Sequence, residues 1–257
     1  MFELNYKVFG EGFPVVILHG VLGSLDNWQS IAKELSANFK VYIIDQRNHG
    51  KSFHSNNFNY QILSDDLLQF CHQQKIKKGH IIGHSMGGKA AMLFAMQHPS
   101  IVEKLVIVDV ATVAYPDRHS HIFNALLTAD LLHVANREAV ETHLRNKLPR
   151  EDESTVQFLM KGLYRNDENN FAWRFNAQAL WDAYQNVSGD ISGNPFSGKT
   201  LFIKGAKSPY INAENFSTIQ ELFPNNELSE IKDAGHWVHA EKPKEFMEAI
   251  NQFLLKA

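Results

Sequence analysis

The sequence has little of several features that define common protein classes. It contains one cysteine, Cys71, in 257 residues. No internal disulfide can form, and the helical pattern around Cys71 predicts a buried small side chain rather than a reactive thiol. No apolar run approaches the ~18 residues of a membrane-spanning helix. Residues 1–7 have neither a basic leader nor an apolar stretch of signal-peptide length. We therefore expect a cytoplasmic protein with no membrane insertion.

Neither sign of charge dominates the chain. Lys and Arg total 25, Asp and Glu total 28, and the formal net charge is −3. Nucleic acids and anionic membranes attract strongly basic surfaces, so the composition predicts a small-molecule partner and no nucleic acid. The 13 histidines are dispersed, and none has the spacing of a metal-ligand cluster, which predicts no metal site.

Short β-rich runs alternate with amphipathic helical segments over the first 111 residues. Strands are expected at 14–18, 41–44, 79–82 and 105–108, and helices near 27–35, 60–73 and 88–98. Such alternation is typical of parallel strands joined by helical crossovers, and strands that are apolar on both faces require a covered sheet. The fold class is therefore α/β, with a mostly parallel sheet and helices on both of its faces.

The alternation of strands and helices stops after Asp109. Successive helices without intervening strands are expected near 122–132, 137–148, 153–163 and 175–184, before alternation resumes at 200–204. We predict a core formed by residues 1–111 and 191–257, with residues 112–190 inserted as a helical cap. Bulky cap residues such as Phe123 and Leu126 are candidate substrate walls. The aromatic stretch 171–181 fits either the interior of the cap or such a wall.

The segment Gly83-His84-Ser85-Met86-Gly87 lies between an expected strand and an expected helix. A serine hydroxyl is a poor nucleophile, and a G-x-S-x-G turn exposes it at a sharp strand-to-helix corner. The three fixed positions occur by chance in roughly one chain in ten of this length, so the flanking strand and helix carry the argument. Ser85 is the predicted nucleophile.

A serine nucleophile also needs a base and donors for the oxyanion. His236 follows the last expected strand, and it comes roughly 150 residues after Ser85 in the chain order Ser before His. His239 is the second candidate for the base. The oxyanion donors should be the backbone N–H of Met86 and that of Val21, in the glycine-containing loop that follows the first strand.

The carboxylic acid that would orient the histidine is the least obvious of the three expected catalytic side chains. The strand at 201–204 leads through Gly205 to Ser208, a serine where a Gly-x-x-Asp pattern would supply a carboxylate. Asp109 ends the strand next to the one that carries Ser85, and its carboxylate could reach the same histidine. We predict Asp109 as the acid. The alternatives are that Asp109 only ties down the loop into the cap, or that the acid is Asp182, Asp190 or Asp233.

Several segments together carry a resemblance to a known family. They are HGVLGSLDNW at 19–28, DQRNHGKS at 45–52, GHSMGGKA at 83–90, LVIVDVA at 105–111, WRFN at 173–176, GAKSPYI at 205–211 and AGHWVHAEKP at 234–243. The chain resembles the α/β-hydrolases, and more narrowly the YbfF-type esterases of bacteria, over nearly its whole length. The resemblance implies an α/β-hydrolase fold with a cap and esterase or thioesterase activity on acyl substrates, including fatty acyl thioesters. It also supports Asp109 independently.

These observations predict a cofactor-free serine hydrolase whose partner is a small acyl ester or thioester. A serine at the elbow argues against epoxide hydrolases and haloalkane dehalogenases, which need a carboxylate nucleophile. A C–C bond hydrolase or a cofactor-free peroxidase keeps the same three side chains and stays as an alternative. A small-molecule binding protein with slow turnover is another, because a fold alone does not determine function.

Overall fold

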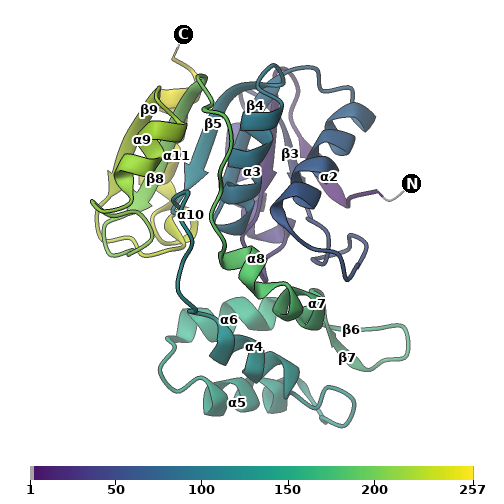
Figure 1. The fold of residues 1–257 in the computed structure, drawn as a ribbon. Helices are drawn as coiled ribbons and strands as arrows, with labels where there is room; N and C mark the ends of the chain where they lie inside the picture. The colour runs from purple at the N-terminus through teal and green to yellow at the C-terminus, as the bar shows by residue number, and fades with distance from the viewer. Residues whose placement is uncertain (1–2, 257) are drawn as a thin grey trace.

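A twisted seven-stranded sheet forms the centre of residues 3–256, the part of the chain that the computed structural model describes (Figure 1). Residues 1–2 of the amino-terminal segment considered above lie outside it. The strands are β1 (Tyr6–Phe9), β2 (Pro14–Leu18), β3 (Lys40–Ile44), β4 (Gly79–His84), β5 (Val102–Val108), β8 (Lys199–Gly205) and β9 (Asn226–Ile231), in the order β1-β3-β2-β4-β5-β8-β9. Only β1 is antiparallel to its neighbour. The mostly parallel sheet is confirmed.

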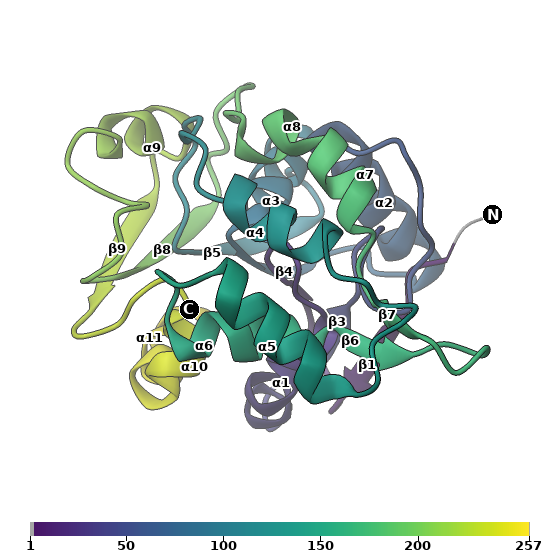
Figure 2. The same ribbon diagram turned by 90° about the horizontal axis from the view of Figure 1, so that it is seen from below.

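Helices cover both faces of this sheet (Figure 2). They are α1 (Gln29–Leu35), α2 (Tyr60–Gln73), α3 (Met86–Gln97), α9 (Phe216–Leu222) and α11 (Pro243–Leu254), with the short helices η1 (Leu25–Trp28) and α10 (Val238–Glu241). Alternate strand residues point to opposite faces. Val16 and Leu18 therefore belong to one buried cluster, which includes residues of α2, α3 and α9, whereas Val15 and Ile17 belong to a second cluster with residues of α1 and α11. Within residues 3–256, no helix is both long and apolar enough to cross a membrane.

A second group of helices lies below the sheet in the view of Figure 1. Its elements are α4 (Ser120–Leu127), α5 (Arg137–Lys147), α6 (Glu153–Lys161), α7 (Ala177–Asp182) and α8 (Tyr184–Ser188). We call residues 120–188 the cap. Residues 109–119 lead from β5 into it and residues 189–198 lead back to β8; we call these the connecting segments.

The expectation that residues 112–190 contain no strands is wrong. Strands β6 (Leu163–Arg165) and β7 (Phe171–Trp173) pair as an antiparallel hairpin. Its turn includes Asn169 at φ 64°, a left-handed conformation that asparagine tolerates. Strands of three residues are too short to display the alternation that identifies a strand in a sequence. The expected helix at 175–184 is also divided, into α7 and α8.

Candidate active site

Ser85 occupies the sharp turn between β4 and α3. Its φ of 53° and ψ of −119° lie in a region that non-glycine residues rarely adopt. The turn requires glycine on both sides. A Cβ on Gly83 would collide with the carbonyl oxygen of Gly87, and a Cβ on Gly87 would lie 2.5 Å from that of His19. The elbow expected from the sequence is therefore a strained strand-to-helix corner that exposes a serine.

The loop after β2 lies directly against Ser85. A Cβ on Gly20 would lie 3.3 Å from the Cβ of Ser85 and 2.9 Å from Nδ1 of His84, so only glycine allows this approach. The next residue, Val21, lines one cavity together with Ser85 and Met86. The structure thus brings these three sequence-predicted residues together. Backbone N–H groups of such a loop and of a helix start are suited to hold an oxyanion.

Two buried histidines hold this loop in place. The Leu22 N–H donates to Nε2 of His49 at 3.1 Å, and the Gln46 N–H donates to Nε2 of His19 at 3.1 Å. A ring nitrogen that accepts a hydrogen bond carries no proton, so each ring is protonated at Nδ1, which lies 2.8 Å from a backbone carbonyl oxygen. Burial lowers the pKa of both side chains and keeps them neutral.

Asp109 follows the last residue of β5 and is fully buried. Its Oδ2 lies 2.7 Å from Nδ1 of His236. The Gly205 N–H donates to Oδ1 at 3.0 Å, and the Ser208 hydroxyl donates to Oδ2. Because an ionised carboxylate only accepts hydrogen bonds, Nδ1 of His236 carries the proton and Nε2 is left as an acceptor. The structure therefore joins the predicted acid to the predicted base, with Ser208 supporting the acid.

Further contacts hold His236 in place. The ring of Tyr210 stacks on it, with centroids 4.2 Å apart and an interplanar angle of 25°. Nε2 of His84 donates to the carbonyl oxygen of His236 at 3.0 Å. Burial lowers the pKa of His84, so the residue next to Ser85 stays neutral. The bond to Asp109 and the stack on Tyr210 fix the orientation of the ring, and the bond from His84 holds its backbone.

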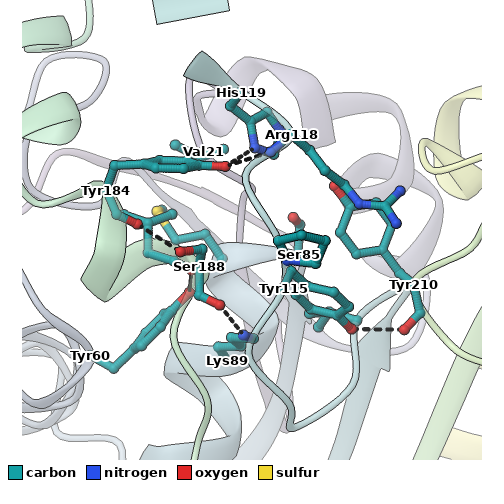
Figure 3. Close-up of a pocket in the computed structure, with 14 residues that line it drawn as sticks. Val21, Tyr60, Ser85, Lys89, Tyr115, Arg118, His119, Tyr184, Ser188 and Tyr210 are labelled. Atoms are coloured by element: carbon teal, nitrogen blue, oxygen red, sulfur yellow. Dashed lines mark hydrogen bonds between the residues drawn. The ribbon is translucent and has the colours of Figure 1, made fainter. Parts of the chain in front are cut away.

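Ser85 lines two cavities, the smaller of which is drawn in Figure 3. The smaller cavity has a volume of about 30 Å³ and lies among four tyrosine rings, Tyr60, Tyr115, Tyr184 and Tyr210. The larger cavity, of about 1070 Å³, runs between the cap helix α6 and the loops at the carboxyl ends of the strands, and His236 lines it. A bound molecule could therefore extend from Ser85 in two directions.

Comparison with known proteins matches this geometry. Residues 14–243 match the family described as alpha/beta hydrolase fold. The chain belongs to the α/β-hydrolase family. Esterase YbfF of Escherichia coli is 36% identical, over 94% of this chain and 92% of that protein. The sn-1-specific diacylglycerol lipase ABHD11 of Danio rerio is 39% identical, over 98% of this chain and 82% of that protein.

A solved structure described as a marine microorganism esterase superposes with a TM-score of 0.94 at 38% identity, covering 99% of this chain and 100% of that one. The resemblance to α/β-hydrolases and YbfF-type esterases is thus confirmed. The protein is an α/β-hydrolase of the esterase and lipase type, and its fold class is the one expected from the sequence.

In this α/β-hydrolase the other candidates for base and acid lie in different surroundings. The ring of His239 stacks on Trp28 with centroids 4.1 Å apart, and burial lowers its pKa to about 3. Asp182, Asp190 and Asp233 are exposed. Among residues 3–256, no three His, Cys, Asp or Glu side chains are grouped so that they could hold a metal ion.

The structure corrects the expected role of two cap residues. Phe123 is fully buried and packs against Trp181 and Tyr184 at centroid distances of 5.6 and 5.7 Å. The carbonyl oxygen of Leu126 accepts a hydrogen bond from Nε1 of Trp173 at 3.2 Å. Neither Phe123 nor Leu126 lines either cavity. They belong to the interior of the cap. Of the aromatic stretch 171–181, Phe171 and Phe175 are buried, Trp181 is exposed, and no residue lines either cavity.

Sequence reasoning also missed residues that surround Ser85. Tyr210 stacks on His236, and the guanidinium carbon of Arg118 lies 5.5 Å from the centroid of the Tyr210 ring. Lys89 is buried beside the smaller cavity. Tyr210 lies in the GAKSPYI segment and Lys89 in GHSMGGKA, so the resemblance marked both segments without assigning a task to either residue.

Proposed function

We propose that this protein is a serine hydrolase that cleaves carboxylic acyl esters or thioesters through an acyl-enzyme on Ser85. The observation that carries the proposal is the 2.7 Å hydrogen bond from His236 to the buried Asp109, beside a cavity that contains the strained Ser85. This arrangement suits a histidine whose free Nε2 takes the serine proton. The names of the relatives, an esterase and a diacylglycerol lipase, support an ester bond as the target.

The proposed reaction has two halves. Oγ of Ser85 attacks the acyl carbonyl carbon while Nε2 of His236 takes the hydroxyl proton, and the backbone N–H groups of Val21 and Met86 stabilise the resulting oxyanion. The tetrahedral intermediate collapses, His236 returns the proton to the departing alcohol or thiol, and Ser85 is left acylated. A water molecule then attacks the acyl carbon with the same assistance, which releases the carboxylic acid and restores the serine.

The two cavities support a division of the substrate. Val110, Val187 and the tyrosine rings give the smaller cavity a mainly apolar lining, and its volume of about 30 Å³ suits a short acyl chain. The larger cavity has charged and amide side chains, including Asp26, Glu151 and Lys161. We assign the acyl group to the smaller cavity and the alcohol or thiol to the larger one.

Replacement of the nucleophile tests the proposal. Ser85→Ala should lower turnover of a 4-nitrophenyl acyl ester by ~10⁴-fold or more, because no other group can carry the acyl intermediate. Ser100→Ala, at an exposed serine in the turn after α3, is the control and should keep full activity. A fluorophosphonate should label the wild-type protein on Ser85 and leave Ser85→Ala unlabelled.

Four results would contradict this function. Ser85→Ala could retain more than about a tenth of wild-type turnover, or the fluorophosphonate could modify another residue. Absence of an initial burst of nitrophenol at the enzyme concentration, together with tight substrate binding, would favour the slow-turnover binding protein. Faster cleavage of a β-diketone or faster halide peroxidation than ester hydrolysis would favour the C–C hydrolase or the peroxidase.

A further inference from the structure

Lys89 is a buried cation that the proposed reaction does not use. It lies on α3 one turn after Ser85, and its side chain is buried, with the residue only 1% exposed. The backbone N–H of Lys89 donates to the Ser85 carbonyl oxygen at 3.1 Å. Nζ donates to the carbonyl oxygens of Val113 at 2.8 Å, of Ser188 at 3.4 Å and of Gly189. The three protons of the ammonium group are matched by three backbone acceptors.

These acceptors lie where the cap joins the core. Val113 belongs to the connecting segment that leaves β5, and Ser188 and Gly189 lie where α8 passes into the returning segment. The two segments are also bonded to each other, from the Tyr115 N–H to the Ser188 carbonyl oxygen at 2.8 Å and from the Ile191 N–H to that of Thr112 at 2.7 Å. One ammonium group on α3 thus ties both ends of the cap. Its bond to Ser188 is drawn in Figure 3.

The tied segments form a wall of the smaller cavity. Tyr115 and Ser188 line it together with Ser85 and Lys89. Nζ of Lys89 lies 4.7 Å from the ring centroid of Tyr115 and 5.9 Å from that of Tyr60, distances at which a cation is attracted to a ring face. Displacement of this wall would change the room beside Ser85 without moving the groups that perform the chemistry.

We propose that Lys89 is a positioning residue: its ammonium group fixes the two connecting segments over Ser85 and thereby limits the length of the acyl chain that the smaller cavity accepts. The proposal rests on the acyl hydrolysis assigned above to Ser85. It concerns selectivity between substrates, and Lys89 itself takes no part in bond making or breaking.

The charge on Lys89 decides how many of the carbonyl groups it can hold. Burial lowers its pKa to about 8, against a smaller opposing effect of Asp190. Below that pH the ammonium group has three N–H donors, and above it the neutral amine has two for the same three acceptors. The tie between the connecting segments should therefore be complete below pH 8 and weaker above it.

Other titratable or charged groups also lie near the cavity. They are Tyr60, Tyr115, Tyr184, Tyr210, Arg118, His119 and Asp190. Burial raises the pKa of each of the four tyrosines, and it lowers that of His119 to about 4. A change in acyl selectivity near pH 8 would thus report on Lys89.

A matched pair of variants tests the proposal. Lys89→Met keeps the apolar length of the side chain and removes its three donors. Lys104→Met is the control, because Lys104 is also buried and its Nζ donates to three carbonyl oxygens, those of Phe253, Leu254 and Lys256. These acceptors lie at the end of α11 and beyond it, outside the cap and its connecting segments. Both variants lose the same kind of buried cation.

The measurement is the ratio of kcat/KM for acetyl to that for octanoyl 4-nitrophenyl ester, from pH 6 to 9.5. Ionisation of the groups that act on both substrates cancels in this ratio. In the wild type the ratio should fall roughly tenfold as the pH rises through 8, the size expected for the loss of a few wall contacts. Lys89→Met should give the low ratio at every pH, and Lys104→Met should follow the wild type.

Several outcomes overturn the proposal. A Lys89→Met ratio equal to that of the wild type across the pH range, or an equal change in Lys104→Met, would reduce Lys89 to a contributor to stability. If Lys89→Met does not fold, the wild-type profile decides, and a ratio that is constant between pH 6 and 9.5 rejects the proposal. Absence of ester and thioester hydrolysis by the wild type would reject the proposed function instead.

Discussion

Asparagine is the replacement for Asp109 that disturbs the backbone and the packing least. Asp109 has a φ of 51°, in the left-handed region that asparagine tolerates. The carboxylate accepts hydrogen bonds on both oxygens, from Gly205 on Oδ1 and from Ser208 and His236 on Oδ2. An amide has one oxygen, so in Asp109→Asn an NH₂ group must face donors on one of the two sides.

Both orientations of that amide impair the histidine. If the NH₂ group faces His236, Nδ1 must become the acceptor, and the proton moves to the Nε2 that should take the proton of Ser85. If it faces the Gly205 N–H, two buried donors oppose each other, and the histidinium formed during the reaction loses its anionic partner. We expect kcat to fall by roughly 10³- to 10⁴-fold, the loss seen for a triad aspartate. This corresponds to roughly 4 to 5.5 kcal/mol of activation free energy.

The assay is steady-state hydrolysis of an acetyl ester, with thermal melts of every variant. Ser208→Ala is the internal comparison. It removes one donor to the carboxylate and leaves the charge, so a loss on the order of tenfold or less is expected. Both variants must melt close to the wild type for the comparison to hold. Near-normal kcat in Asp109→Asn, or a large loss in Asp182→Asn or Asp190→Asn instead, would refute the assignment of the acid.

Two further predictions concern the scaffold. Gly87→Ala should lower the unfolding free energy by about 1–3 kcal/mol or more, because the new methyl group would lie 2.5 Å from the His19 carbonyl oxygen. Gly193→Ala is the control, because the methyl group added there meets only the flexible Met96 side chain. Equal urea midpoints for the two variants would contradict the argument. Burial lowers the pKa of His49 in the folded state. Below pH ~6.5 this histidine therefore binds a proton in the unfolded chain but not in the folded protein, and the free energy of unfolding should fall from pH 7 to 5. His49→Gln keeps an acceptor for the Leu22 N–H and should reduce that slope by up to about 1.4 kcal/mol per pH unit in urea unfolding, whereas an unchanged slope would show that other groups cause it.

The parts of the fold that could be predicted are those that local sequence determines. Residues 79–82 are apolar except for His80, and residues 88–96 are apolar except for Lys89 and contain no breaking proline. A strand and a helix are therefore expected on either side of Ser85. Asp109 could be found because it directly follows an apolar strand, at the sheet edge where Ser85 also lies. β1 was missed because Tyr6, Lys7 and Val8 are exposed at the edge of the sheet, where burial imposes no pattern on the sequence.

The cavity walls could not be predicted, because they depend on how the cap sits over the core. An amphipathic cap helix has an apolar face whether that face packs against another cap helix or lines a cavity. Phe123 and Ile122 are neighbours on α4, yet Phe123 is inside the cap and Ile122 lines the larger cavity. The stacking of Tyr210 on His236 likewise joins residues 26 positions apart, and no local pattern encodes that contact.

The serine at position 208 is compatible with the proposed role of Asp109, at the end of β5, as the catalytic acid. A carboxylate at 208 would place a second negative charge beside Asp109, and two carboxylates in contact cannot both stay ionised at neutral pH. A hydroxyl at the same place donates to Asp109, as the Gly205 N–H does. The turn after β8 therefore supplies donors rather than a charge. The absence of Gly-x-x-Asp there and the presence of Asp109 at the end of β5 are two aspects of one arrangement, which places a single carboxyl group against His236.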